Sequence, residues 1–309
     1  MKNRYKQLGI LIILLLALFF VFSDGYYKWL TGYIFLWFIQ AYVAWFLRFK
    51  CNQPFVGFSV TMGIGAYGTI VLTTMYGWSN LQAMLVSIVV SAIVAIIIFM
   101  STSRAKGFYV TMVSFLLAIM FPKLIEAMRE ITGGRSGLYF NGLEVGENVL
   151  YTVIILITVA ILGFFIWLMS TNTGKIFTLI SENDELTQAV GINTFKYKIL
   201  AYGIGGLISA LGGALYVNYT GFVSSIDINV FTTVYITFMP IIGGSGVFYG
   251  PILGTLFIRL LPEFLVNVER YLDIIYGCSF FLVMLLLPDG FGPSLEKYIK
   301  KFKGGENNA

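Results

Sequence analysis

The sequence predicts an all-α polytopic membrane fold with about ten transmembrane helices. Only 11% of the 309 residues are charged, whereas a soluble domain carries about 25%. Hydrophobic residues make up 58% and aromatic residues 17%, as expected for lipid-facing and interfacial positions. Uncharged stretches long enough to cross a bilayer, about 20 residues, recur along the whole chain.

Individual spans are assigned from these uncharged stretches. We predict them at residues 8–22, 29–47, 55–76, 81–100, 108–128, 150–169, 199–217, 230–248, 250–266 and 271–288. Residues 51–103 carry no charge, and Tyr76–Asn80 forms the natural turn that divides them into two spans. The eighth and ninth spans are separated only by Val247–Pro251. A cleaved signal peptide is an alternative for the first run, because basic residues precede it.

Lysine and arginine are distributed unevenly between the two sides of this topology. With the N-terminus inside, the inner loops hold Lys2, Arg4, Lys6, Arg48, Lys50, Arg104, Lys106, Lys175, Lys196, Lys198, Lys297, Lys300, Lys301 and Lys303, and the outer loops hold Lys28, Arg129, Arg135 and Arg270. Cytoplasmic loops carry an excess of these residues. We therefore predict a bacterial inner-membrane protein with both termini in the cytoplasm.

Composition also excludes several functions. The net charge of +5 lies in short clusters between apolar runs, which fits cytoplasmic loops and argues against nucleic-acid binding. The chain has no histidine, and Cys51 and Cys278 fit no metal-ligand spacing. Gly174-Lys175 lacks the remaining residues of a phosphate-binding loop. We expect no cofactor on this chain and no catalytic residue, so nucleotide energy would come from another chain.

The predicted transmembrane domain covers residues 1–309, with one long inner loop at 170–198 and a basic tail at 294–309. In the loop, Ser181 or Asn183 could cap a short helix whose first turn carries Asp184 and Glu185. Leu186, Ala189 and Val190 follow, and Gly191 would end the helix. Such a helix either docks a soluble partner or is an ordinary loop helix.

Two glycine-rich spans are expected to break or kink. One contains Gly63, Gly65 and Tyr67, and the other contains Gly243, Gly244 and Gly246. If spans two to five and seven to ten form inverted halves, these are the second spans of each half, where broken helices often line transport paths. The alternative is close helix packing through small residues.

Charged residues inside or near spans need partners. Lys123, Glu126 and Arg129 are spaced to pair on one helix face, and Arg259 and Glu263 are four residues apart. Ion pairs at the membrane interface explain these residues better than a role in a transport path.

Several motifs, in order, resemble the second permease subunit of branched-chain amino acid ABC importers, over residues 30–295. They are Gly63–Tyr67; Arg104, Gly107 and Tyr109; the outer-loop residues Thr132, Gly133, Gly134, Arg135, Ser136, Gly137 and Leu138; Glu182, Ala189 and Gly191–Asn193, followed by Tyr197-Lys198; Gly243-Gly244, Gly246, Tyr249–Pro251 and Gly254; Leu261–Glu263; and Pro288 with Gly290–Gly292. The sequence departs from the family at Ser181, where a basic residue is usual, and at Phe55–Ser59.

The resemblance implies an ABC importer that transports and makes or breaks no covalent bond. Its partners would be a second homologous permease, two cytoplasmic ATPases, an extracytoplasmic solute-binding protein and the lipid bilayer. It also implies that Glu182, Asp184, Glu185, Ala189 and Gly191 couple the chain to an ATPase. The implied solutes are branched-chain amino acids, with urea or amides as alternatives.

Two other classes of function fit the sequence less well. A secondary transporter driven by an ion gradient is disfavoured because no span centre carries a suitable Asp or Glu. A membrane-embedded enzyme is disfavoured because the sequence has no histidine and no paired polar cluster at one depth.

Overall fold

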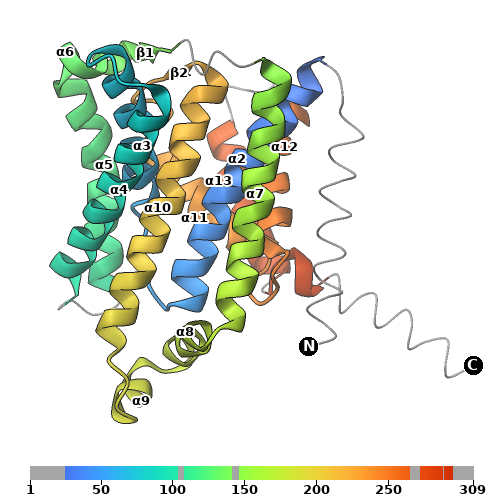
Figure 1. The fold of residues 1–309 in the computed structure, drawn as a ribbon. Helices are drawn as coiled ribbons and strands as arrows, with labels where there is room; N and C mark the ends of the chain where they lie inside the picture. Colours follow the sequence, from blue (N-terminus) through green and yellow to red (C-terminus); the bar gives the residue numbers. More distant parts are fainter. Residues whose placement is uncertain (1–24, 104–107, 141–145, 265–271, 288, 295–309) are drawn as a thin grey trace, which may run out of the picture. The chain divides into compact units, whose positions relative to one another are not determined.

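The computed structural model describes residues 25–103, 108–140, 146–264, 272–287 and 289–294. The first predicted span, 8–22, lies outside this part of the chain, as does the tail from residue 295 on. The described elements are almost entirely helical (Figure 1), which confirms the predicted fold class.

Each of the other predicted spans corresponds to a helix. The longer elements are α2 (Gly25–Trp45), which continues as the π-helical turn η1 (Phe46–Lys50), α3 (Phe58–Thr74), α4 (Asn80–Thr102), α5 (Phe108–Ala127), α7 (Glu147–Ser170), α8 (Asn172–Glu182), α10 (Thr194–Thr220), α11 (Val230–Gly243), α12 (Gly250–Phe264) and α13 (Leu272–Leu286). Among the described residues, five helices are long and apolar enough to cross a membrane, and shorter apolar helices lie at Phe58–Thr74, Val230–Gly243 and Ile274–Leu286.

Short elements complete the fold. They are α6 (Arg129–Thr132), the 3-10 turn η2 (Gly134–Ser136), α9 (Asp184–Ala189) and the strands β1 (Leu138–Tyr139) and β2 (Phe222–Val223). The two strands pair antiparallel, with Leu138 opposite Val223 and Tyr139 opposite Phe222.

The chain divides into two compact units, with boundaries inside α2 and α11. The central unit is Phe35–Ile236, and the terminal unit combines the residues up to Ile34 with those from Thr237 on. These units do not coincide with the predicted inverted halves, since α10 lies in the central unit with α3, α4 and α5. The inverted repeat stays a prediction.

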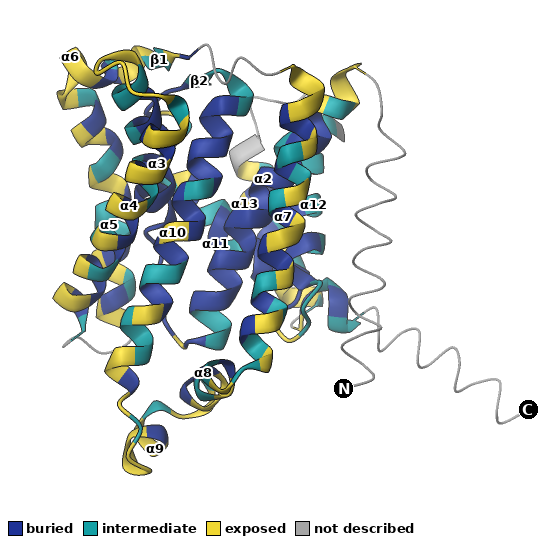
Figure 2. Cartoon of the chain, viewed as in Figure 1, coloured by how far each residue is buried: buried dark blue, intermediate teal, exposed yellow. Residues whose placement is uncertain are grey.

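In the central unit, α10 packs closely against α3 and α4. A Cβ at Gly65 of α3 would collide with the backbone of Ala210, and one at Gly213 of α10 would collide with the backbone of Met62. Figure 2 shows buried residues along much of α10 and exposed residues along one side of α4, α5 and α7. Small residues therefore bring the helix backbones together, and large apolar side chains on the outer helices face the surroundings.

A buried polar network joins four helices of this unit. The amide of Gln40 on α2 donates to Ser209 O, and Ser209 Oγ donates to Gln40 Oε1, both at 2.8 Å. Thr61 Oγ1 on α3 shares a 2.8 Å hydrogen bond with Ser209 Oγ on α10. Ser91 on α4 donates to Thr61 O at 3.1 Å and to Gly206 O at 3.3 Å. These bonds satisfy polar groups that would be costly to bury alone.

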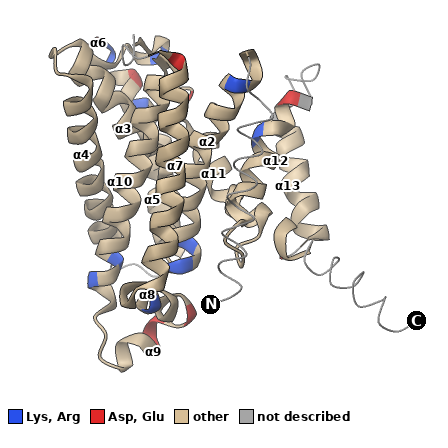
Figure 3. Ribbon diagram, turned by 45° about the vertical axis from the view of Figure 1, so that its right-hand side comes forward, with Lys and Arg blue, Asp and Glu red and all other residues tan. Residues whose placement is uncertain are grey.

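The two ends of the central unit differ. α8 and α9 lie at one end beside η1, and α6, η2 and the strand pair lie at the other (Figure 1). Charged residues of this unit gather at these two ends (Figure 3). The α9 end has the basic residues Arg48, Lys50, Lys175, Lys196 and Lys198, and the strand end has Lys123, Arg129 and Arg135.

One expected helix break is found and the other is not. α3 continues without interruption through Gly63 and Gly65, so the span does not break there, and a kink stays a prediction. α11 does end at Gly243, Gly244 follows with a φ of 106°, and α12 begins at Gly250. A positive φ is costly for any residue with a Cβ, which explains why glycine occupies this reversal.

Candidate functional site

The inner-loop segment consists of two short helices that precede α10, and each of the three begins at a side-chain cap. Thr171 Oγ1 accepts from Gly174 N, Asn183 Oδ1 from Leu186 N, and Asn193 Oδ1 from Lys196 N. Of the two predicted caps, Ser181 and Asn183, it is Asn183 that caps α9, and the helix starts at Asp184. The caps satisfy amide groups at the start of each helix and fix where α9 begins.

The end of α9 also follows the prediction. Gly191 has a φ of 87° and its N–H donates to Gln188 O at 2.9 Å. Nothing lies within 4 Å of the position that a Cβ would take on Gly191. Glycine is therefore favoured at position 191 by the positive φ of the backbone and not by lack of space for a side chain.

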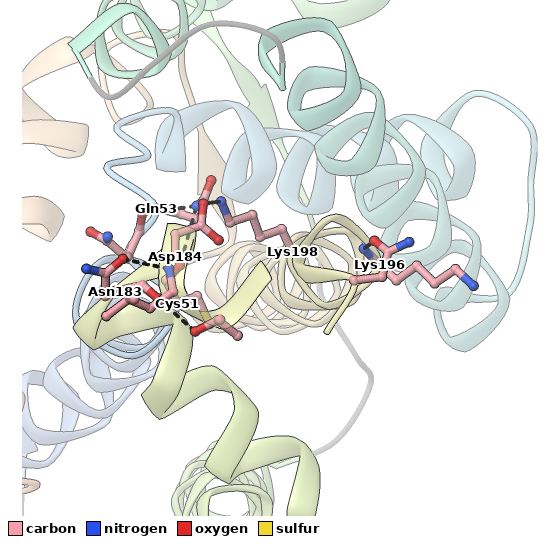
Figure 4. Close-up of polar contacts among 10 residues, drawn as sticks. Cys51, Gln53, Asn183, Asp184, Lys196 and Lys198 are labelled. Carbon is pink, nitrogen blue, oxygen red and sulfur yellow. Dashed lines mark hydrogen bonds and ion pairs between the residues drawn. The ribbon is translucent and has the colours of Figure 1, made fainter. Parts of the chain in front are cut away.

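One face of α9 is held against the protein. Thr187 is 4% exposed, and Lys198 Nζ on α10 donates to Asp184 Oδ2 at 2.5 Å (Figure 4). The Lys198 side chain is 16% exposed and that of Asp184 28%. The ion pair links α9 directly to α10.

The charge of Asp184 is stabilised in the folded chain. Partial burial opposes ionisation, but the hydrogen bond and the charge of Lys198 favour it and lower the pKa of Asp184. The pair therefore contributes stability above the ordinary aspartate pKa of about 3.9. That contribution is lost only as the pH falls through the lower folded-state pKa, so the pair is intact throughout the neutral range.

The opposite face of α9 is uncovered. Leu186 is 65% exposed and Val190 74% exposed, and they lie four residues apart, on one side of the helix. Glu182, Glu185 and Ala189 are exposed beside them. We call Leu186 and Val190 the apolar ridge.

A cavity of about 910 Å³ lies beside α9 within the central unit. Residues of α9 and the start of α10 form one wall, and the end of α4, the start of α5 and the segment after η1 form another. Its lining is Asn52, Gln53, Pro54, Phe99, Thr102, Ser103, Val110, Asp184, Glu185, Gln188, Gly191, Ile192, Asn193, Thr194, Phe195 and Lys198.

The segment after η1 is fixed by local contacts. The Gln53 amide donates to Asn52 O at 3.0 Å, and Asn52 has a φ of 50°. Cys51 is fully buried, and burial raises the pKa of its thiol despite the nearby Lys198 and Lys50, so the thiol stays protonated. Among the described residues no group of three or more His, Cys, Asp or Glu side chains could hold a metal ion.

At the other end of the central unit, the predicted outer-loop residues form a compact turn. Thr132 Oγ1 donates to Ile125 O at 2.6 Å and accepts from Gly134 N at 3.2 Å. Gly133, Gly134 and Gly137 all have positive φ, and a Cβ at Gly137 would collide with the backbone of Val223. The motif builds the turn that leads into β1.

The expected path residues of α3 have different surroundings. Gly65 lies against the backbone of α10, which is packing geometry, and a Cβ at Gly63 would meet the side chains of Phe121 and Ile228. Tyr67 is 5% exposed, and its hydroxyl is buried with no hydrogen-bond partner in the described part of the chain.

The second set of expected path residues lies in the terminal unit. A Cβ at Gly243 would collide with the backbone of Gly250, and one at Gly244 would meet Pro293, whereas Gly246 has open space around it. The two sets of glycines lie in different units, with Gly63 and Gly65 in the central unit and Gly243, Gly244 and Gly246 in the terminal unit.

Sequence reasoning missed the partner of Asp184. Lys198 is fourteen positions further on, across a helix end and a turn, and no helical spacing rule pairs such residues. The cavity was not predictable from the sequence either, because Asn52, Gln53 and Thr102 lie far from α9 in the sequence and come near it only in the folded chain.

The apolar helices and the family comparison together identify the class: an integral membrane protein of the permease type. The model of the branched-chain amino acid transport system / permease component family matches residues 30–286. The chain therefore belongs to that family. No solved structure matches it.

Individual relatives are distant. The chain is 20% identical over 279 residues to the high-affinity branched-chain amino acid transport system permease protein LivM of Salmonella typhimurium, which covers 81% of the chain and 66% of that protein. It is 31% identical over 123 residues to a probable branched-chain amino acid transport permease protein LivM of Methanocaldococcus jannaschii, covering 38% and 34%. The autoinducer 2 import system permease protein LsrC of Escherichia coli is 24% identical over 116 residues, covering 36% and 34%. The chain thus spans just under two thirds of the length of the first of these relatives.

Proposed function

We propose that this chain is a membrane-spanning subunit of an ATP-driven importer and that α9 is its docking element for a cytoplasmic ATPase. The observation that carries the proposal is the apolar ridge: Leu186 and Val190 are largely exposed on a short, capped helix. Leaving such side chains in water forgoes about 1.5–3 kcal/mol of burial free energy each. A groove on a partner protein would recover it.

The charges around the ridge favour a protein over a lipid surface. Glu182 and Glu185 are exposed beside it, and the cytoplasmic leaflet carries a negative potential that repels carboxylates. A protein groove with basic residues would accept both the ridge and the acidic groups. ATP hydrolysis then takes place on the ATPases, and this chain supplies the route.

Membership of the family supports the remaining parts of the proposed assembly. A second homologous permease completes the pathway and an extracytoplasmic binding protein delivers the solute. The basic residues at the α9 end support its cytoplasmic location, in the inner membrane of a bacterial cell. We propose branched-chain amino acids as solutes, because LivM relatives are named for their transport, with urea or amides as the alternative.

We place the solute route along α3, near Gly63 and Tyr67, and at the α11–α12 reversal, at Gly243, Gly244 and Gly246. Support comes from the Tyr67 hydroxyl, which is buried without a partner in the described part of the chain. An unpaired buried hydroxyl costs about 1–3 kcal/mol, and a passing polar solute would satisfy it.

The docking role is tested with the complete importer in proteoliposomes. Leu186→Asp and Glu182→Lys alter the exposed face, and Gly191→Val strains the turn that ends α9. We expect each to lower both ATPase binding and ATP-dependent uptake at least tenfold while membrane insertion stays normal. Gly77→Val is the matched control, since Gly77 also has a positive φ, 66°, with open space around it, but lies between α3 and α4.

Normal uptake in all three variants, Leu186→Asp, Glu182→Lys and Gly191→Val, would refute the docking role. Uptake that needs no ATPase and collapses when the ion gradient is dissipated would instead establish the secondary-transporter alternative.

A further inference from the structure

The Asp184–Lys198 pair is a polar connection between α9 and the membrane-spanning helix α10. Its lysine side chain is 16% exposed, against 72% for Lys123 in the Lys123–Glu126 pair, while the two carboxylates are similarly exposed, at 28% and 30%. Exposed ion pairs contribute about 0–1 kcal/mol, whereas a partly buried pair is screened less by solvent. The Asp184–Lys198 pair is therefore suited to hold α9 in a fixed relation to α10.

The cavity restricts how α9 can influence the rest of the unit. α9 and the start of α10 form one wall, which holds the Asp184–Lys198 ion pair (Figure 4), and Phe99 and Thr102 of α4 lie on another. Among the described residues, the cavity separates α9 from the lining residues of α4 and α5. A displacement of α9 toward the cavity meets open space, so α9 acts on the bundle through the elements that it contacts, α8 and α10.

α10 is built to pass such a displacement on. Its Gly213 and Ala210 touch the backbone of α3, and Gly206 touches α4. Ser209 bonds to Gln40 and Thr61 in the buried network. Closely packed helices move together because their interiors have low compressibility.

We propose that Asp184 and Lys198 are positioning residues that transmit the ATPase-driven displacement of α9 to α10, and thereby to α3 and α4. This inference rests on the proposed function. Without the pair, α9 still binds the ATPase through its exposed face, but it loses its ion pair with α10 and keeps only weaker links, which include the turn at Val190–Asn193 and the packing of Thr187. ATP hydrolysis then proceeds without moving the spans.

The experiment uses the complete importer in proteoliposomes with loaded and empty binding protein. Asp184→Asn, Lys198→Met and the double variant are compared with wild type for assembly, ATP hydrolysis and solute imported per ATP. We expect assembled complexes that hydrolyse ATP, lose stimulation by the loaded binding protein, and import at least tenfold less solute per ATP. The double variant should import no less solute per ATP than either single variant, because the two residues act as a unit.

Two further variants define the controls. Lys198→Arg keeps the charge and should keep the wild-type ratio of solute to ATP within about twofold. Lys123→Met removes the exposed pair on α5 and should leave the ratio unchanged.

The possible outcomes separate the hypotheses. If uptake, hydrolysis and complex yield fall in proportion, so that the ratio is constant, the pair has a purely structural role and the inference is wrong. A normal ratio in both single variants refutes it as well. A wild-type complex that imports nothing with ATP would overturn the proposed function itself, and this inference with it.

Discussion

At the scale of single residues, the ends of α9 are set by two side chains and one backbone conformation. Asn183 caps its start, and Gly191 ends it with a left-handed φ. Both were predictable, because capping residues and a terminal glycine are local signals. The pairing of Asp184 with Lys198 was not predictable, since it depends on how the chain turns between α9 and α10.

Tyr67 provides a residue-scale test of the solute route. Tyr67→Phe removes a buried hydroxyl that has no partner among the described residues, so the stability of the complex should not fall. If the solute accepts or donates a hydrogen bond there, losing about 1 kcal/mol raises the KM for uptake by roughly fivefold. Uptake kinetics and thermal unfolding of the purified complex measure the two effects.

Tyr202→Phe is the matched control. Tyr202 is 1% exposed, lies between Phe55 and Phe99, and also has a buried hydroxyl without a partner in the described part of the chain. The KM for uptake by the Tyr202→Phe variant should stay at the wild-type value. An unchanged KM in Tyr67→Phe would remove Tyr67 from the route.

At the scale of elements, helix positions were predictable from hydropathy, but helix continuity at glycine was not. Glycine-rich sequence is compatible with a broken helix and with close packing. At Gly243-Gly244 the chain leaves α11, whereas at Gly63 and Gly65 it stays helical. The difference comes from the neighbouring helix. Gly65 packs directly against the backbone of α10 at Ala210, where a Cβ would collide.

Gly65→Ala tests this packing. A Cβ at Gly65 would collide with the Ala210 backbone, so α3 and α10 must separate, at a cost of about 1–3 kcal/mol. We expect a lower thermal unfolding temperature and less assembled complex. Gly163→Ala is the control, since nothing lies within 4 Å of a Cβ there and alanine favours helix by about 1 kcal/mol.

A different pattern would favour the route at Gly65. If Gly65→Ala leaves stability and assembly at wild-type levels but lowers uptake, the added methyl group obstructs the solute.

At the scale of the whole molecule, the all-α membrane fold was predictable because bilayer thickness and the need to satisfy backbone groups leave few options. The low content of charged residues, 11%, reflects the apolar environment of the lipid bilayer. The division into a central and a terminal unit was not predictable, because it depends on which helices α10 packs against. Sequence position groups α10 with α11 to α13, but its small residues pack it against α3 and α4.

The orientation of the central unit is the last prediction. The α9 end carries more Lys and Arg than the strand end, so it should face the cytoplasm. Cys51 is buried and Cys278 exposed, so Cys278→Ser gives a background with low reactivity. In that background Tyr139→Cys, at a residue 81% exposed, should react with a membrane-impermeant thiol reagent in intact cells. Val190→Cys, at the residue that directly follows α9 and is 74% exposed, should react only after permeabilisation, and both should react in detergent. Labelling of Val190→Cys in intact cells would place α9 outside, where no cytoplasmic ATPase could reach the apolar ridge.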